Sequence, residues 1–290
     1  MMMRSLLFSL GLASLATVAT TTVAAGSGWA ELYPEVAARV ASGAPVVIHV
    51  TVPLCHHEQI DCGSRAAGDP GRPETNLYWG AIFGAKRMFA RSRSGWSALT
   101  STREVPGVLE RAVYRRYVDG ASWGRDDEEV EVLVVLDAIH GDAIDDAVAG
   151  FFRRATRGGT IVIDDGARRR TLALSAAGYA GHNRLMDGLA LPEVKRAHPK
   201  AVASFVLACF SDSYFSDALR RAGSSPVVMT RSLMAPEGYV VDAVAKGLGR
   251  NEGAATVRAR AVHAYARWQR IAVRVAERVF ARVRSRRRGD

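Results

Sequence analysis

The chain has 290 residues, 48% of them hydrophobic and 23% charged, which fits one large α/β domain or two small ones. Its net charge is +10, but residues 250 to 290 hold twelve arginines against three acidic residues, so the rest is close to neutral. This excludes a basic character spread over the whole domain. No Walker loop and no GxGxxG fingerprint occurs, so nucleotide-binding α/β enzymes find no support.

The first 25 residues form a compositional unit of their own. Arg4 supplies a positive charge, residues 5 to 19 are apolar with many small side chains, and Thr22 to Ala25 offer small residues for cleavage. This order is typical of a secretory signal peptide, so we predict export to the periplasm or the exterior. The alternative is a short helix that anchors the N-terminus to a membrane. A cytoplasmic location is less favoured.

A helix, a buried strand and a long loop are expected next. Apolar residues at helical spacing predict a helix from Glu31 to Ser42, which Gly43 and Pro45 end. The β-branched run from Val46 to Leu54 predicts the first strand, with His49 as a packed, hydrogen-bonded core residue.

The segment from Cys55 to Thr75 is dense in Gly and Pro and too long for a simple connection. In an oxidising compartment Cys55 and Cys62 can close a disulfide and leave Cys209 as a free thiol. The alternatives are unpaired thiols, or a zinc site built from the polar residues of the loop (Cys55, His56, His57, Asp61 and Cys62). The spacing matches no standard zinc finger, so we predict no metal and no cofactor.

The middle of the chain continues the α/β pattern. Asn76 is a suitable N-cap for a helix from Leu77 to Arg91. Residues 108 to 117 predict a short element, 119 to 129 a solvated acidic loop, and 130 to 136 the second strand.

Polar residues follow that second strand. Asp142 is expected to cap a helix from Ala143 to Ala155, and His140 is a minor candidate for catalysis. Residues 160 to 163 and the run from Thr171 then predict a hairpin that enters the third strand.

Two apolar runs between Thr171 and Ser213 each end at a chemically capable residue. TLALSAAGYAGHN reaches His182, and AVASFVLACFSDS reaches Cys209. Both are typical of buried strands in a parallel sheet, where reactive groups collect beyond the carboxyl ends. Residues 184 to 201 are expected to form a mostly helical crossover between them. If the strands are neighbours, thiol and imidazole meet at one edge, as a cysteine nucleophile and its base require.

Three further elements complete the predicted domain. A helix from Ser211 to Ala222 places Cys209 just before a helix N-terminus, which stabilises a thiolate. Val227 to Thr230 predict the fifth strand. Residues 234 to 239 open another helix at the same end, where Glu237 either contacts a substrate or caps the helix.

Residues 253 to 288 predict one long helix with arginines around an apolar stripe (Val257, Ala261, Ala264, Trp268, Ile271, Val275, Val279 and Val283). This helix either packs on the domain or docks on an anionic membrane surface or an acidic partner. Nucleic acid is less favoured, because no binding motif accompanies it. We therefore expect an α/β domain over 26–249, followed by a basic C-terminal helix and tail over 250–290.

The block ending in His182 and the block ending in Ala208-Cys209 resemble the caspase-type cysteine peptidases, including the gingipain-like bacterial members. The similarity covers roughly residues 46 to 230. It implies a three-layer αβα sandwich with a mostly parallel sheet, a catalytic pair of His182 and Cys209, and a peptide or protein substrate. Residues beside the pair (Gly181, Asn183 and Ser211) would then bind substrate or help stabilise an oxyanion. Those peptidases usually have Gly after the His, where this chain has Asn183.

The chain also resembles, over most of its length, an uncharacterised bacterial family. The matching segments are NLYWGA (76–81), GHNRLMD (181–187), LACFSDSYF (207–215) and LMAPEGY (233–239). This second similarity implies a shared architecture and no particular reaction.

The leading hypothesis from the sequence is a cysteine hydrolase, above all a peptidase. One alternative is a non-catalytic caspase-like binding domain with an inert Cys209, which the Asn183 departure favours. Another is an exported envelope protein that acts through its basic C-terminal helix. The sequence marks no interface, so it leaves the oligomeric state open.

Overall fold

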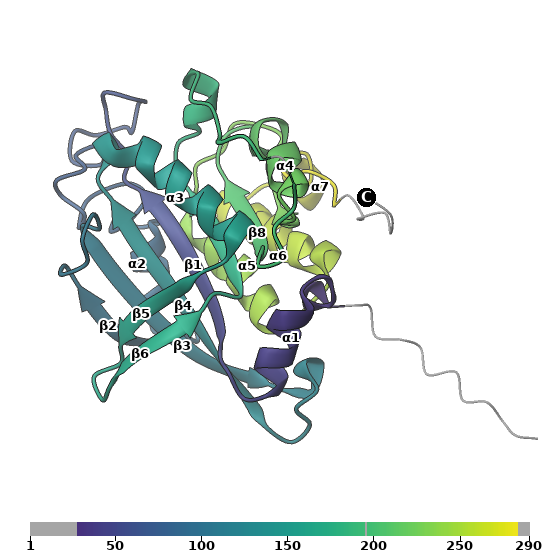
Figure 1. The fold of residues 1–290 in the computed structure, drawn as a ribbon. Coiled ribbons are helices and arrows are strands. Elements are labelled where there is room, and N and C mark those ends of the chain that lie inside the picture. The colour runs from purple at the N-terminus through teal and green to yellow at the C-terminus, as the bar shows by residue number, and fades with distance from the viewer. Residues whose placement is uncertain (1–27, 195, 284–290) are drawn as a thin grey trace, which may run out of the picture.

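The computed structural model describes residues 28–194 and 196–283 (Figure 1). The predicted signal peptide or anchor and the last seven residues lie outside these ranges. Within them, no helix has the length and apolar character needed to cross a membrane.

A seven-stranded sheet forms the centre of the protein, in the order β2-β3-β4-β1-β7-β8-β9. Strands β4, β1, β7, β8 and β9 run parallel, while β2 and β3 form an antiparallel edge. Their bounds are β1 Val46–Pro53, β2 Ser97–Thr102, β3 Glu110–Asp119, β4 Glu129–Ile139, β7 Ala176–Ala180, β8 Ala203–Leu207 and β9 Pro226–Val228. Strand β1 is buried along its whole length, which explains its continuous apolar sequence.

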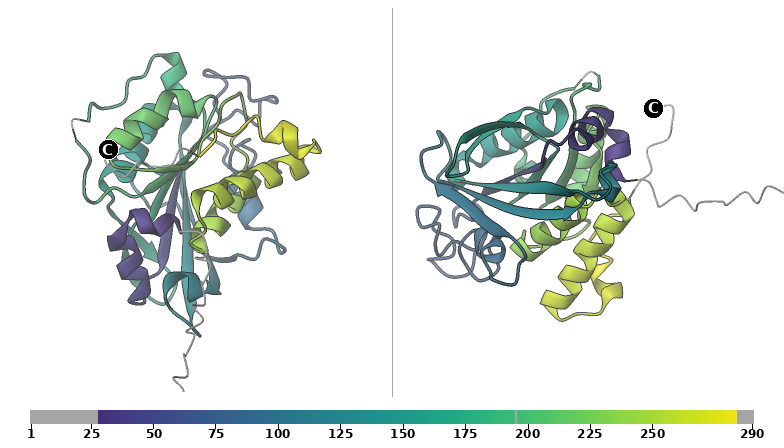
Figure 2. Two further views of the ribbon diagram at one scale, coloured as in Figure 1. Left: turned by 90° about the vertical axis from the view of Figure 1, so that its right-hand side faces the viewer. Right: turned by 90° about the horizontal axis from the view of Figure 1, so that it is seen from below.

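Helices cover both faces of this sheet (Figure 2). One face carries α1 (Pro34–Ala41), α3 (Ile144–Arg157) and α4 (Ser211–Arg221), and the other carries α2 (Ala85–Phe89), α5 (Gly238–Gly249) and α6 (Ala254–Gln269). The predicted α/β class, with a mostly parallel sheet between helices, is confirmed. The other helical elements of the described residues are the short helix α7 (Val273–Ala276) and the 3₁₀ turns η1 (Trp29–Leu32), η2 (Ala121–Trp123), η3 (Gly141–Ala143) and η4 (Arg184–Asp187).

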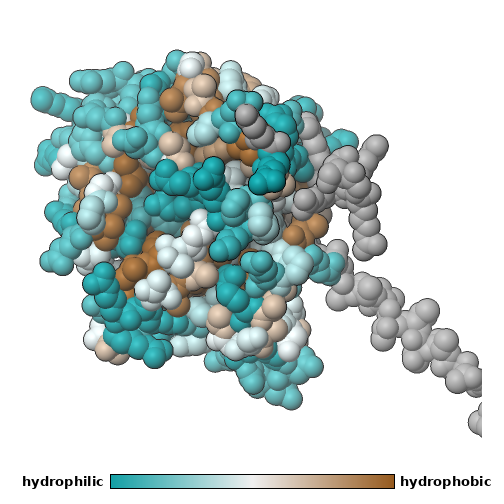
Figure 3. Space-filling model, viewed as in Figure 1, coloured by the Kyte–Doolittle hydropathy of each residue, from teal (hydrophilic) through white to brown (hydrophobic). Residues whose placement is uncertain are grey.

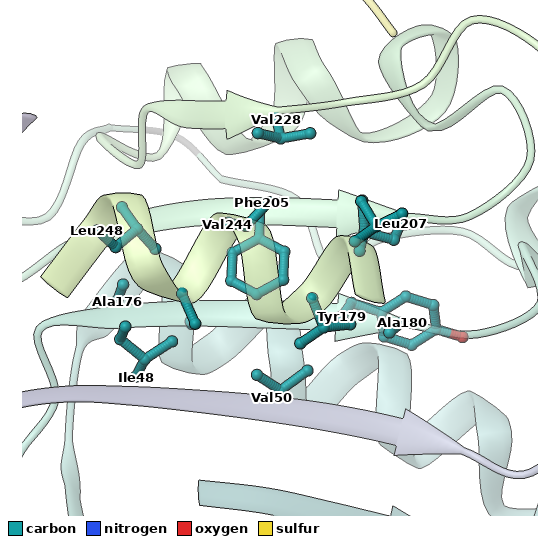
Figure 4. Packing of buried hydrophobic residues seen from close by; sticks show 14 of the residues in the cluster. Ile48, Val50, Ala176, Tyr179, Ala180, Phe205, Leu207, Val228, Val244 and Leu248 are labelled. Carbon is teal, nitrogen blue, oxygen red and sulfur yellow. The ribbon is translucent and has the colours of Figure 1, made fainter. Parts of the chain in front are cut away.

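The core between the sheet and α5 is built from interlocking aliphatic and aromatic side chains (Figure 4). Phe205 of β8 lies fully buried against Val244 and Leu248 of α5. Its ring occupies the space beside Gly178 on the neighbouring strand, where a Cβ atom would lie 2.2 Å from the ring. Burying such a side chain contributes about 1.5–3 kcal/mol.

Hydrophilic residues cover most of the face seen in Figure 3, with hydrophobic residues in small areas between them. The exposed large hydrophobic side chains come from several different elements (Leu32, Ile82, Tyr117, Met186, Tyr214, Leu233, Val273 and Val275).

The expected third strand from Thr171 is wrong in its extent. Residues 169–173 form β6 (Arg169–Ala173), which pairs with β5 (Thr160–Asp164) in a separate antiparallel hairpin. The run breaks at Ser175, whose amide donates to the carbonyl of Val47 at 2.8 Å and whose Oγ accepts from the Val47 amide at 3.1 Å. Only after this junction does the chain enter the central sheet.

The expected helix from Leu77 to Arg91 is also wrong over most of its length, because only α2 is helical there. Asn76 does not cap it. Its buried carboxamide accepts from the Cys55 amide at 3.1 Å and donates to the Cys55 carbonyl at 2.8 Å. A Cβ atom at Gly84 would lie 2.3 Å from the carbonyl oxygen of Trp79, so the tight turns of this segment need glycine.

The crossover between β7 and β8 is mostly irregular, contrary to the expected helix. Among its described residues only η4 is helical, and Gly188 ends this turn in the left-handed region, with φ 97°. Pro192 and Pro199 follow, and each removes an amide that a continued helix would need.

The predicted continuous C-terminal helix ends at Gln269. Arg270 adopts the left-handed conformation, with φ 54°, and the chain then folds back so that α7 packs on α6. The guanidinium of Arg258 holds this return by donating to the carbonyl oxygens of Phe280 and Ala281, at 3.0 and 2.6 Å. The apolar stripe is therefore divided between two packed elements, and residues 284–290 lie outside the described ranges.

Candidate functional site

The carboxyl ends of four parallel strands lie at one edge of the sheet. His140 follows β4, Cys55 follows β1, His182 follows β7 and Cys209 follows β8. Strand β4 lies on one side of β1, whereas β7, β8 and β9 lie on the other side. The order in which the chain adds strands to the sheet therefore reverses beside β1. Such a reversal at the carboxyl edge is where open α/β sheets bind their ligands.

The two predicted catalytic residues occupy matching positions on adjacent strands. Strands β7 and β8 pair in parallel, with Ala180 opposite Leu207, so His182 and Cys209 each stand two residues beyond the last pair. Neighbouring strands lie about 4.8 Å apart. The prediction that the two strands are neighbours is confirmed.

Asn183 ties the two strand ends together from a fully buried position. Its Nδ2 donates to the carbonyl oxygen of Cys209 at 2.6 Å, and its Oδ1 accepts from the amide of Leu185 at 3.1 Å. The residue that departs from the caspase-type pattern therefore fixes the spacing of His182 and Cys209.

The imidazole of His182 is held by an acid that the sequence reading did not single out. Its Nε2 lies 2.6 Å from Oδ2 of Asp187, and Arg184 donates to that same oxygen at 2.9 Å. Burial raises the pKa of Asp187, but the hydrogen bonds from His182 and Arg184 outweigh it and leave the pKa below its ordinary value. Asp187 therefore stays ionised and orients the imidazole. In the sequence, Asp187 could have been found as the carboxylate five residues after the His that follows the strand.

Within the described residues no hydrogen bond joins His182 to Cys209. The Nε2 atom of His182 faces Asp187, and Nδ1 has no hydrogen-bond partner there. The Cys209 thiol is free and partly exposed, and its Sγ lies 3.5 Å from the carbonyl oxygen of Met234. The paired strands bring the two residues to neighbouring backbone positions, but the imidazole and the thiol each contact other groups.

Gly181 and Ser211, both expected near an oxyanion, have their amides engaged elsewhere. The Gly181 amide donates to the carbonyl of Leu207 at 3.2 Å, and the Ser211 amide to Oγ1 of Thr230 at 3.1 Å. The Ser211 hydroxyl also donates to the carbonyl of Val206 at 2.8 Å. These residues brace the turn that carries Cys209 rather than presenting donors to a substrate.

Two phenol side chains lie near enough to Cys209 for its charge to affect their pKa values. Burial raises the pKa of Tyr78, and the nearby Cys209 adds to this effect. Burial also raises the pKa of Tyr265, with smaller contributions from Glu237 and Cys209. Tyr78 follows Asn76 in the loop before α2, and Tyr265 lies on α6, so segments distant in the sequence converge on Cys209.

Glu237 belongs to this surrounding group and makes no side-chain cap on α5. Its carboxylate accepts from the hydroxyl of Tyr239 and, at 2.7 Å, from Nε2 of Gln269. Burial raises its pKa, and the hydrogen bond from Gln269 only partly opposes this.

A Gly-x-Ser-x-Gly pattern spans Gly120 to Gly124 but lies in the turn between β3 and β4. A nucleophile elbow instead connects a strand to a helix. This turn precedes β4, so it lies at the opposite edge from Cys209, and Ser122 is not a candidate nucleophile.

The loop after β1 is closed by a disulfide between Cys55 and Cys62, which leaves Cys209 as the free cysteine of the described residues. The two cysteines are seven positions apart in the sequence, so the bond closes a short loop. It holds the start of the long loop beside the carboxyl edge of the sheet.

Replacing both Cys55 and Cys62 with alanine is expected to lower the free energy of unfolding by about 2–3 kcal/mol. The reason is that the unfolded chain regains the entropy of a short closed loop. Urea unfolding under oxidising conditions measures this, with Cys209→Ala as the matched control, expected to change stability by less than about 1.5 kcal/mol. Equal stabilities of the double variant and the parent would contradict the prediction.

No protein-family model matches this chain, and no curated protein or solved structure is significantly similar to it.

Proposed function

We propose that this protein is a cysteine hydrolase acting on peptides or proteins, with a caspase-like arrangement of the sheet. The observation that carries the proposal is the matched placement of His182 and Cys209 beyond the paired ends of β7 and β8. The free, partly exposed thiol and the Asp187–His182 hydrogen bond support it. A nucleophile, a base and a group that orients the base are the parts that covalent catalysis needs.

In this mechanism Nδ1 of His182 accepts the thiol proton of Cys209. The thiolate attacks the scissile carbonyl carbon, and a sulfur–carbon bond forms. The imidazolium then gives its proton to the leaving amine as the carbon–nitrogen bond breaks. Water hydrolyses the acyl-enzyme and restores the thiol. Asp187 holds the ring and stabilises its charged form throughout.

The free enzyme need not show the His182–Cys209 hydrogen bond, because such bonds often shorten only when substrate is bound. The side chain of His182 is 11% exposed, so substrate can reach it from the edge of the sheet. Export of the protein is consistent with the Cys55–Cys62 disulfide, because such bonds persist in oxidising compartments.

A second candidate function is a non-catalytic domain that binds a partner. It is favoured by the engaged amides of Gly181 and Ser211 and by the unengaged pair of His182 and Cys209. A third candidate function is docking of the C-terminal segment on an anionic membrane surface or an acidic partner. The exposed Val273 and Val275 of α7, beside Arg274, support it.

Iodoacetamide labelling of the native protein between pH 5 and 9 separates the first two candidates. Cys209 is expected to react rapidly below pH 7, and His182→Ala to slow this reaction by at least about tenfold, since thiolate formation then loses its base. Mass spectrometry of the labelled parent and of Cys209→Ala, which lacks this thiol, shows whether Cys209 is the labelled site. His198→Ala is the matched control, because His198 is exposed and lies in the crossover before β8.

Labelling of Cys209 that appears only on unfolding, or that is indifferent to His182, would make the thiol a packing residue. The partner-binding candidate would then replace the hydrolase.

A further inference from the structure

The carboxyl edge of the sheet carries a second group of chemically capable side chains, at the ends of β1 and β4. One ligand atom from each of His56, Glu58 and Asp142 lies within 4.8 Å of the others. His56 and Glu58 belong to the disulfide-closed loop after β1. Asp142 belongs to η3, after β4. These three residues play no part in the proposed hydrolase chemistry.

Asp142 does not cap the following helix, contrary to expectation. The N-cap of α3 is Ala143, which makes no side-chain cap bond. The carboxylate of Asp142 instead faces two imidazoles: its Oδ1 lies 3.1 Å from Nδ1 of His56, and its Oδ2 lies 3.3 Å from Nδ1 of His140.

The Nδ1 atom of His56 is shielded from solvent, and its contact with Asp142 Oδ1 at 3.1 Å lacks the geometry of a hydrogen bond. A buried ring nitrogen without a well-formed hydrogen bond loses part of the interactions it had with water. Two ligands of one tetrahedral zinc ion, each about 2.0–2.1 Å from the metal, lie about 3.3 Å apart. The separation between His56 Nδ1 and Asp142 Oδ1 is close to this value, so a single ion can engage both atoms.

The backbone around this group is held from several directions. The Cys55–Cys62 disulfide closes the loop that presents His56 and Glu58. Gln59 Nε2 donates to the carbonyl of Gly141 at 2.7 Å and joins the loop to η3. A Cβ atom at Gly141 would lie 2.6 Å from Cβ of His56, so glycine is what lets the two segments approach so closely. The backbone that presents the ligands is therefore preorganised, as selective metal sites require, while the carboxylates of Glu58 and Asp142 are exposed to solvent.

We propose that His56, Glu58 and Asp142 bind a divalent transition-metal ion of the zinc class, with water in the fourth position. The donor set decides the class, because imidazole suits zinc, while calcium and magnesium prefer six or more oxygen ligands. The two carboxylates balance the charge of the ion. The ion joins the loop after β1 to η3 and so fixes the loop beside the carboxyl edge.

Isothermal titration of the chelator-treated full chain with zinc chloride tests this proposal. One zinc ion per chain is expected. Loss of an outer-shell partner already lowers the metal affinity of known sites by about 10–100-fold, so His56→Ala and Asp142→Asn are each expected to lower it at least that much. Two matched controls are expected to bind normally. The first is His57→Ala, because Nε2 of His57 lies 2.9 Å from the Ser64 carbonyl oxygen. The second is Asp146→Asn, because Asp146 lies on the exposed first turn of α3.

A cobalt-substituted sample separates this site from Cys209. A site of nitrogen and oxygen ligands gives visible d–d bands without a thiolate charge-transfer band. Loss of zinc binding in Cys209→Ala would overturn the proposal. Zinc binding that survives in both His56→Ala and Asp142→Asn, with circular dichroism showing that both variants are folded, would also overturn it. So would the absence of any saturable zinc binding by the parent chain.

Discussion

Replacing Asp137 with asparagine is expected to lower the free energy of unfolding by about 3–5 kcal/mol. Asp137 is 1% exposed on β4 and forms two hydrogen bonds with the guanidinium of Arg111, both 2.7 Å long. Nε2 of His49 lies 2.8 Å from the same carboxylate. Without the negative charge, the cation of Arg111 stays buried with no counter-ion, and that is the costly step.

Urea unfolding of the two proteins measures this effect. Glu74→Gln is the matched control, because Glu74 pairs with Arg103 at 2.6 Å but both side chains are about two-thirds exposed. Its loss is expected to stay below about 1 kcal/mol. A loss at Asp137 no larger than that at Glu74 would show that the buried cluster contributes little.

The same cluster predicts a loss of stability in acid. Burial lowers the pKa of His49 despite its attraction to Asp137, so the unfolded chain takes up a proton below about pH 6.5 before the folded chain does. Burial opposes ionisation of Asp137, but His49 and Arg111 hold the pKa of that carboxyl below its ordinary value. Its contribution is present above about pH 4 and declines as the pH falls further. His49→Gln is expected to remove the part of the loss between pH 7 and 5.

His182→Ala is expected to lower kcat/KM by about 10²–10⁴-fold on any peptide that the parent enzyme cleaves, because a positioned general base contributes that much. Asp187→Asn is expected to lower it by about 10–100-fold. The reason is that a hydrogen bond to a charged group contributes about 1.5–3 kcal/mol. A fluorogenic peptide library first identifies a cleaved sequence, and initial rates then compare the variants.

His198→Ala and Asp146→Asn serve as controls for these two changes, because both residues are exposed and neither contacts His182. A loss confined to KM would assign Asp187 to substrate binding. Hydrolysis that persists unchanged in Cys209→Ala would reject the hydrolase mechanism itself.

The strands that carry the site could be predicted from the sequence because they are continuous apolar runs, and only a sheet covered on both faces buries such runs completely. This holds for β1, β4 and β8, whose expected ranges overlap the observed ones closely, but not for β7, whose expected first residues belong to β6. The sequence also predicted correctly that His49 is a buried, hydrogen-bonded residue of the core. The neighbouring positions of His182 and Cys209 follow from strand pairing and needed no side-chain information.

The segments between the strands were harder, because their conformation depends on partners distant in the sequence. Leu77–Arg91 has helical spacing, but the Asn76 carboxamide binds Cys55 and holds the segment in turns. The apolar stripe after residue 253 is continuous in sequence, but the chain reverses at Arg270 and packs α7 on α6.

By itself, the sequence determined the α/β class, the parallel strands and the two residues at their ends, because hydrophobic periodicity is local information. Only the tertiary structure decided which polar groups meet: Asp187 with His182, Arg111 with Asp137, and His56 with Asp142. A hydrogen bond or an ion pair depends on distances of about 3 Å between side chains. Packing of the whole chain, and not the spacing of residues along it, sets those distances.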